Sequence, residues 1–187
     1  MMKKHFVFSY TNILFREIEK KEYLSFFRKF FNLFYKLFVN FIKKKIGLIE
    51  NLENKKNIQK EDLSLGKLFE IFNSDKGLFL KTNDNKEIKS HNYSIFYEKY
   101  FKDLRNKKLR ILEIGSHEGK GLAAFYYFFQ NAFLIGANIN PFQMKFHSKR
   151  IDEIYLDVSS KRVLENFSNY FKEGFDIIID DASHNLR

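Results

Sequence analysis

The chain has 187 residues but no cysteine, no tryptophan and only one proline. The absence of cysteine excludes disulfide bonds and structural zinc sites built on cysteine ligands. The basic start, Met1 to Lys4, is not followed by an apolar stretch with a small-residue cleavage site, so we expect no secretory signal peptide. No internal repeat is visible. The absence of cysteine is typical of a cytoplasmic protein.

Phenylalanine and positive charge are abundant instead, with 24 Phe and a formal net charge of +10. Residues 1–62 carry 14 Lys+Arg and 7 Asp+Glu, a net charge of +7. Residues 63–187 carry 19 Lys+Arg and 16 Asp+Glu, a net charge of +3. This asymmetry predicts three parts: a basic, Phe-rich helical region over 1–50, a polar linker over 51–62, and a globular domain over 63–187.

Residues 23–42 predict an amphipathic helix, because their polar side chains recur every three or four positions and form one narrow face. Three internal cations argue against a membrane-spanning helix, since each costs roughly 2.5–3.5 kcal/mol at a bilayer centre. Two interpretations remain open. The helix docks on the domain or on a second copy in a homo-oligomer, or residues 23–45 make peripheral contact with the inner face of the membrane. Nucleic-acid binding is disfavoured, because the cations form no tight patch with glycine-flanked aromatics.

The domain alternates short apolar strands with helical segments, which predicts an α/β fold with a parallel sheet. We expect helices over 122–129 and 160–171. We expect strands over 109–114, 132–138, 153–156 and 175–179. Ligands of such sheets bind at the carboxyl ends of the strands. The polar residues at or near those ends are Glu113, Asn138, Asp157, Asp180 and Asp181.

The first strand runs into a loop with glycines at 115, 119 and 121 and then into a helix. This layout presents backbone N–H groups to a nucleotide-like ligand. The order E-x-G-x-x-x-G-x-G, starting at Glu113, differs from the dinucleotide fingerprint G-x-G-x-x-G. It resembles motif I of the class I S-adenosylmethionine (SAM) methyltransferases. An ordinary glycine-rich turn of an α/β protein is the alternative interpretation.

Further motifs follow one another in the order of a known family. They are SDKG (74–77), HNY (91–93), YExYF (97–101), LEIG (112–115), GxxINP (136–141) and DDxSH (180–184). Together they resemble the macrocin O-methyltransferase group. The resemblance implies a Rossmann-like, doubly wound parallel sheet, SAM as cofactor, and Mg²⁺-assisted methylation of a sugar hydroxyl on a natural product or surface polysaccharide.

The resemblance also implies roles for individual residues. The amino-acid end of SAM would be held by Glu113, Gly115, Gly119 and Gly121, its ribose by Asn138 and its adenine region by Asp157, with Asp180 beside the cofactor. Asp181 would be a Mg²⁺ ligand and His184 the general base. A turn residue at 157, a cap at 180 and an ordinary loop histidine at 184 are the alternatives. Asp75 and Lys76 predict either a lid over the cofactor or a plain turn.

A class I methyltransferase sheet has seven strands, and only four are predicted here. We therefore expect an incomplete domain that lacks its C-terminal half, including the other metal ligands and most of the acceptor pocket. Two functions follow: a SAM-dependent O-methyltransferase in an incomplete form, or a non-catalytic remnant that binds a membrane or a partner.

Overall fold

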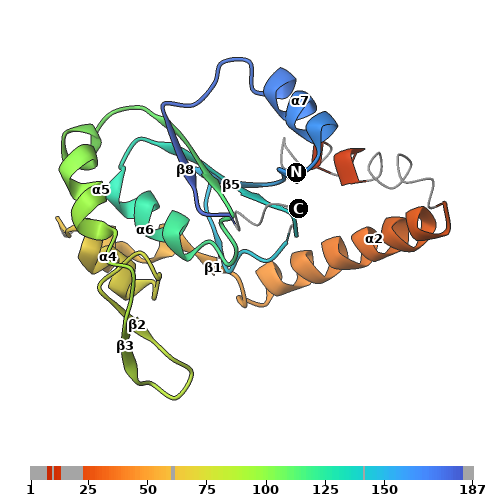
Figure 1. Cartoon of the computed structure of the whole chain (residues 1–187). Coiled ribbons are helices and arrows are strands. Elements are labelled where there is room, and N and C mark those ends of the chain that lie inside the picture. Colours follow the sequence, from red (N-terminus) through yellow and green to blue (C-terminus); the bar gives the residue numbers. More distant parts are fainter. Residues whose placement is uncertain (1–7, 10, 14–22, 60–61, 141, 183–187) are drawn as a thin grey trace.

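A computed structural model describes residues 8–9, 11–13, 23–59, 62–140 and 142–182. At its centre lies a sheet of four parallel strands in the order β7-β5-β4-β8, with helices on both faces (Figure 1). The strands are β4 (Arg110–Ile114), β5 (Phe133–Asn138), β7 (Ile151–Tyr155) and β8 (Ile177–Asp180). Each overlaps one of the four predicted strands, and the α/β prediction is confirmed.

The strand order reverses beside β4. The chain passes from β4 to β5 and then to β7 on one side, and it returns to place β8 on the other side of β4. In this register Glu113 pairs with Gly136, and Ile114 pairs with Asp180. This is the arrangement of a Rossmann-like, doubly wound sheet, in which the reversal opens a crevice at the carboxyl ends of the strands. The glycine loop after β4 therefore begins at the crevice.

One face of the sheet packs against three helices. Ile111, Leu134 and Ile179 point to this face and join a cluster rich in phenylalanine. The helices are α4 (Leu65–Ile71), α5 (Ser94–Phe101) and α6 (Lys120–Phe128). Residues 121–128 of α6 are all buried. Because α6 is apolar all round, it can lie between the sheet and the outer helices, which fixes the position of its N-terminus.

The opposite face packs against α7 (Lys161–Tyr170), whose Val163 lies with Leu112, Ile135 and Ile154. Residues 8–9 and 11–13, from the start of the chain, lie on the same side.

The ring of Phe8 stacks on Tyr170 at 4.4 Å between centroids, and the backbone N–H of Tyr155 donates to Ser9 Oγ at 2.9 Å. Phe8 and Ser9 therefore pack against α7 and β7.

The predicted amphipathic helix is α2 (Tyr23–Lys45). Two residues after its end lies Gly47, whose φ of 78° allows the N–H of Leu48 to donate to the carbonyl of Lys43 at 2.9 Å. Among the described residues, no helix has the length and hydropathy needed to cross a bilayer. The described part of the expected linker is folded onto the domain: β1 (Glu50–Asn51) pairs with β6 (Phe146–His147).

After β1 come a 3-10 turn (Leu52–Asn54) and α3 (Lys56–Gln59). Leu52 is fully buried, and its carbonyl accepts the hydroxyl of Tyr127. A hairpin of β2 (Phe79–Lys81) and β3 (Glu87–Lys89) and a second 3-10 turn (Lys102–Leu104) complete the described elements.

Candidate functional site

The loop between β4 and α6 is shaped by glycine. Gly115 has a φ of 82°, in the left-handed region that favours glycine. A Cβ atom added to it would lie 2.5 Å from the backbone oxygen of Asp181. The loop therefore lies directly against the chain that leaves β8, because only a hydrogen fits between them. The loop that follows β4 and the segment that follows β8 are therefore in contact at the crevice.

The buried carboxylate of Glu113 lies beneath the first turn of α6. A Cβ atom at Gly121 would lie 2.5 Å from Glu113 Oε1, so the absence of a side chain there lets the helix approach the carboxylate. Glu113 is 1% exposed, and its Oε2 has no hydrogen-bond partner among the described residues. A buried carboxylate oxygen without a partner is costly, and a donor from a ligand, an ion or a water molecule would satisfy it.

Lys76 joins this carboxylate to Asp181. Its ammonium lies 3.1 Å from Glu113 Oε1 and 2.6 Å from Asp181 Oδ2, and its side chain is 5% exposed. Asp75 Oδ1 lies at the outer limit of an ion pair, 3.9 Å from the same ammonium. The sequence predicted a lid or a turn at Lys76. The backbone here forms the predicted turn, in which the N–H of Gly77 donates to the carbonyl of Ser74 at 3.1 Å, and the side chain of Lys76 lies inside the crevice.

The pKa values of the pair follow from burial and charge. Burial alone would lower the pKa of Lys76, but the charge of Glu113 and the hydrogen bond and charge of Asp181 outweigh it and raise the pKa above its ordinary value. Burial raises the pKa of Glu113, and the neighbouring ammonium opposes this rise. Lys76 therefore stays protonated near neutral pH and partly neutralises the two carboxylates.

Asn138, at the carboxyl end of β5, holds the glycine loop. Its Oδ1 accepts the backbone N–H of His117 at 3.0 Å. Its Nδ2 donates to Ser116 Oγ at 3.1 Å and to the His117 carbonyl at 3.2 Å. A carboxylate could not donate the latter two bonds. The amide at this position therefore has a structural role in the loop.

The other predicted aspartates make local turns. Asp157 is buried, and its Oδ1 accepts the N–H of Ser159 at 2.9 Å and its hydroxyl at 2.6 Å, just before α7 begins. Asp180 Oδ1 accepts the N–H of Ala182 at 3.2 Å. Both contacts agree with the turn or cap alternatives and leave a cofactor role untested. His184 lies outside the described residues.

The described donors do not complete a site for Mg²⁺. They contain no group of three His, Cys, Asp or Glu side chains that could hold a metal ion. Asp181 is the predicted ligand, but its Oδ2 is bound to the ammonium of Lys76. Water or substrate oxygens would have to supplement this carboxylate to give Mg²⁺ its near-octahedral coordination.

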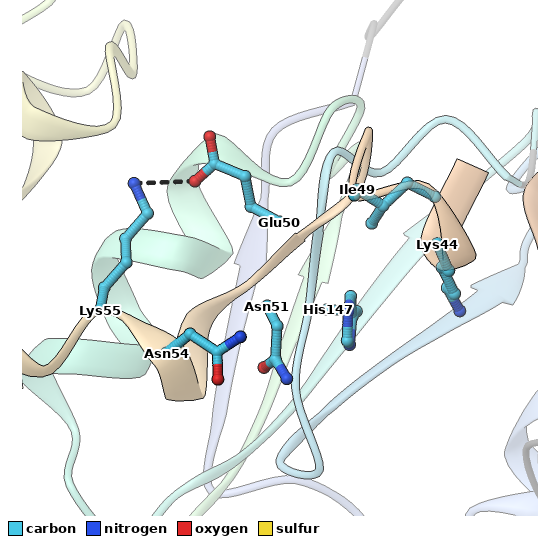
Figure 2. Close-up of a pocket in the computed structure, with 8 residues that line it drawn as sticks. Lys44, Ile49, Glu50, Asn51, Asn54, Lys55 and His147 are labelled. Atoms are coloured by element: carbon cyan, nitrogen blue, oxygen red, sulfur yellow. Dashed lines mark ion pairs between the residues drawn. The ribbon is translucent and has the colours of Figure 1, made fainter.

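A separate pocket of about 560 Å³ lies where the chain leaves α2 and enters β1 (Figure 2). Its lining residues are Lys44, Gly47, Ile49, Glu50, Asn51, Asn54, Lys55 and His147. Lys55 and Glu50 form an ion pair of 2.7 Å across it, as the dashed line in Figure 2 shows. None of the predicted site residues lines this pocket.

No protein-family model and no curated protein matches the chain. Among solved structures, it is similar to the methyltransferase MycE of the mycinamycin biosynthetic pathway. The complex of MycE with Mg and S-adenosylhomocysteine shares 32% identity over 51% of this chain and 26% of that chain, with a TM-score of 0.43. The complex that also holds mycinamycin VI shares 30% identity over 49% of this chain and 25% of that chain, with a TM-score of 0.40.

A third solved structure is a protein-L-isoaspartate O-methyltransferase from Plasmodium falciparum in complex with S-adenosylhomocysteine. It shares 12% identity over 68% of this chain and 59% of that chain, with a TM-score of 0.28. All three are structures of methyltransferases, and the chain spans about a quarter of the length of MycE.

Proposed function

We propose that this chain is a SAM-dependent methyltransferase whose cofactor lies over the glycine loop between β4 and α6. The observation that carries the proposal is the carboxylate of Glu113, which is buried beneath the first turn of α6 with one oxygen unpartnered. The methionine end of SAM bears an ammonium, which can donate to such an oxygen. It also bears a carboxylate, for which unpaired N–H groups at a helix N-terminus are the matching donors.

The residues of the crevice support this assignment in different ways. Gly115, Gly119 and Gly121 keep side chains away from the loop, Glu113 would accept the ammonium, and the first amides of α6 would face the carboxylate. Asn138 and Asp157, at the next two strand ends, would lie beside the ribose and the adenine. The bound cofactor supplies an electrophilic methyl group on a sulfonium.

For the acceptor, we propose a sugar hydroxyl of a glycoside or surface polysaccharide, on the strength of the ordered motifs that end in DDxSH. His184 would take the hydroxyl proton, since an imidazole with a pKa near 6.5 can act as a base at neutral pH. Asp181 would contribute one carboxylate to Mg²⁺. The described residues do not complete that metal site.

The ion pair between Lys76 and Asp181 favours a second candidate, a protein that binds SAM without transferring its methyl group. The ammonium occupies the carboxylate oxygen that a metal would need. The two candidates differ in one measurable respect, because both bind the cofactor and only the first methylates a glycoside.

Calorimetry with S-adenosylhomocysteine tests the shared claim. We expect the wild-type chain to bind and the Gly115→Ala variant not to bind, because the added Cβ atom collides with the Asp181 backbone. Gly174→Ala is the matched control, since Gly174 also has a positive φ but has no atom within 4 Å of its added Cβ.

Glu113→Gln keeps the shape of the site and should weaken binding roughly tenfold or more, because a charge-assisted hydrogen bond is lost. Its fold is checked by thermal unfolding. Equal affinity for wild type, Gly115→Ala and Glu113→Gln would contradict the proposed cofactor site.

A further inference from the structure

We propose that α2 is an interfacial helix that binds the surface of an anionic lipid bilayer. The proposal concerns Tyr23–Lys45 and does not depend on the cofactor site. It is argued from the exposure of one face of this helix and from the charge of its other residues.

One face of α2 carries a row of exposed phenylalanines. Their spacing of four, three, four and three residues puts them on one side of a helix with 3.6 residues per turn. They are Phe27, Phe31, Phe34, Phe38 and Phe41, and each is between 54% and 68% exposed. Leu24, at 89%, and Tyr35, at 67%, flank the row. An exposed apolar patch of this extent on a folded chain marks a surface that another phase or molecule covers.

The apolar surface continues beyond the helix. Ile46 and Leu48 are also exposed, whereas Ile49 is buried in the domain. Because only a short turn through Gly47 separates α2 from β1, the helix is tied to the folded domain at its C-terminal end. In Figure 1 the rest of α2, drawn in orange, extends along the side of the molecule. The whole chain would therefore be held at whatever surface the helix binds.

The charge of α2 identifies that surface as anionic. Between Tyr23 and Lys45 the sequence has no Asp or Glu, and it has six cations: Arg28, Lys29, Lys36, Lys43, Lys44 and Lys45. Arg28 and Lys36 are exposed; at 100° per residue Arg28 lies beside the phenylalanine row and Lys36 on the opposite side of the helix. A long basic side chain beside a buried aromatic face can reach lipid phosphates at the level of the headgroups. Aromatic and basic residues together are typical of helices that lie in a membrane interface.

The same spacing would also fit the seam of a coiled coil between two copies of α2. Charge argues against this occupant, because pairing two copies brings together helices that each carry six cations and no anion. Like charges on neighbouring positions of paired helices repel, whereas anionic lipids compensate them.

The test is sedimentation of the full chain with vesicles. The probes are vesicles of phosphatidylcholine alone and of phosphatidylcholine mixed with an equal amount of phosphatidylglycerol. We expect binding to the mixed vesicles that added salt weakens. Phe31→Ser combined with Phe38→Ser should weaken binding roughly tenfold or more, because two apolar anchors are lost. Phe79→Ser combined with Phe96→Ser, two exposed phenylalanines of the domain, is the matched control and should bind as wild type.

The charge is tested by Arg28→Gln combined with Lys36→Gln, which should weaken binding about 25-fold. Lys107→Gln combined with Lys108→Gln, two exposed cations of the domain, is the control. Equal binding to neutral and mixed vesicles, or vesicle binding that the α2 variants leave unchanged, would overturn the proposal. A dimer in size-exclusion chromatography that the phenylalanine variant dissolves, without any vesicle binding, would assign the face to a second copy instead.

Discussion

At the scale of single residues, Lys76 determines the electrostatics of the crevice. Its ammonium lies within 3.1 Å of Glu113 and 2.6 Å of Asp181, and it is the positive charge that makes a fully buried carboxylate tolerable. Removing one partner of a buried ion pair leaves an uncompensated charge, which typically costs about 3–5 kcal/mol. The crevice should therefore be more sensitive to the loss of Lys76 than to the loss of any exposed lysine.

Lys76→Met should lower the free energy of unfolding by about 3 kcal/mol near neutral pH, as measured by urea denaturation. Adding Glu113→Gln to this variant should recover most of the loss, since no buried charge remains. Lys86→Met is the control, because Lys86 pairs with Asp84 at the surface, and an exposed pair contributes about 0–1 kcal/mol.

The loss in Lys76→Met should also depend on pH. Burial already raises the pKa of Glu113 above its ordinary value of 4.5, and removing the ammonium raises it further. Below pH 4.5 Glu113 is protonated in both the folded and the unfolded chain, so the penalty is absent. It grows as the pH rises through the higher pKa of the folded state. A loss of the same size at acidic and neutral pH would contradict the assigned ion pair.

The residues that could be predicted from sequence are those next to clear strand ends. Glu113, Asn138 and Asp181 follow apolar runs, and the structure brings all three to the glycine loop. Lys76 was predicted only as part of a lid or a turn. Its ion pairs with Glu113 and Asp181 were not predicted, because it lies 37 positions before Glu113 and no local pattern links the two. Its neighbourhood in SDKG was the available signal, but a lysine beside a glycine is also typical of a solvated turn.

At the scale of elements, strands were predictable where burial on both faces produces an unbroken apolar run, as in β8. The β2–β3 hairpin was not predicted, because its strands have only three residues each and are mostly exposed. The folded part of 51–62 was hidden for a related reason. Its composition is polar, and the burial of Leu52 depends on contacts with α6 that are distant in sequence.

The end of α6 offers an element-scale prediction. The guanidinium of Arg150 donates to the carbonyls of Tyr126, Phe129 and Ala132 at 2.8–2.9 Å, and it lies 4.0 Å from the centre of the Tyr126 ring. Carbonyls at a helix C-terminus need such donors, and a cation placed there also interacts favourably with the helix dipole. Arg150 therefore ties α6 to the turn before β7.

Arg150→Ala should lower the free energy of unfolding by about 3 kcal/mol, because several charge-assisted hydrogen bonds are lost together. Arg150→Lys should restore less than half, since an ammonium lacks the planar fork that reaches three carbonyls. The neighbouring exposed Lys149→Ala should change stability by about 0.5 kcal/mol or less. Urea unfolding of the three variants checks this order, and a full rescue by lysine would contradict it.

At the scale of the molecule, the chain combines a four-stranded Rossmann-like sheet with a basic helix whose aromatic face is exposed. The sheet brings one unpartnered carboxylate oxygen, three loop glycines and a helix N-terminus to a single crevice. We propose that this crevice binds the methionine end of SAM.

The most direct test of that claim is a crystal structure of the chain with S-adenosylhomocysteine. We predict that the ligand's ammonium lies within hydrogen-bonding distance of Glu113 Oε2. Its carboxylate should face the backbone amides of the glycine loop and of the first turn of α6. S-adenosylhomocysteine bound elsewhere on the chain, or bound at this crevice with Glu113 making no contact to it, would contradict the account.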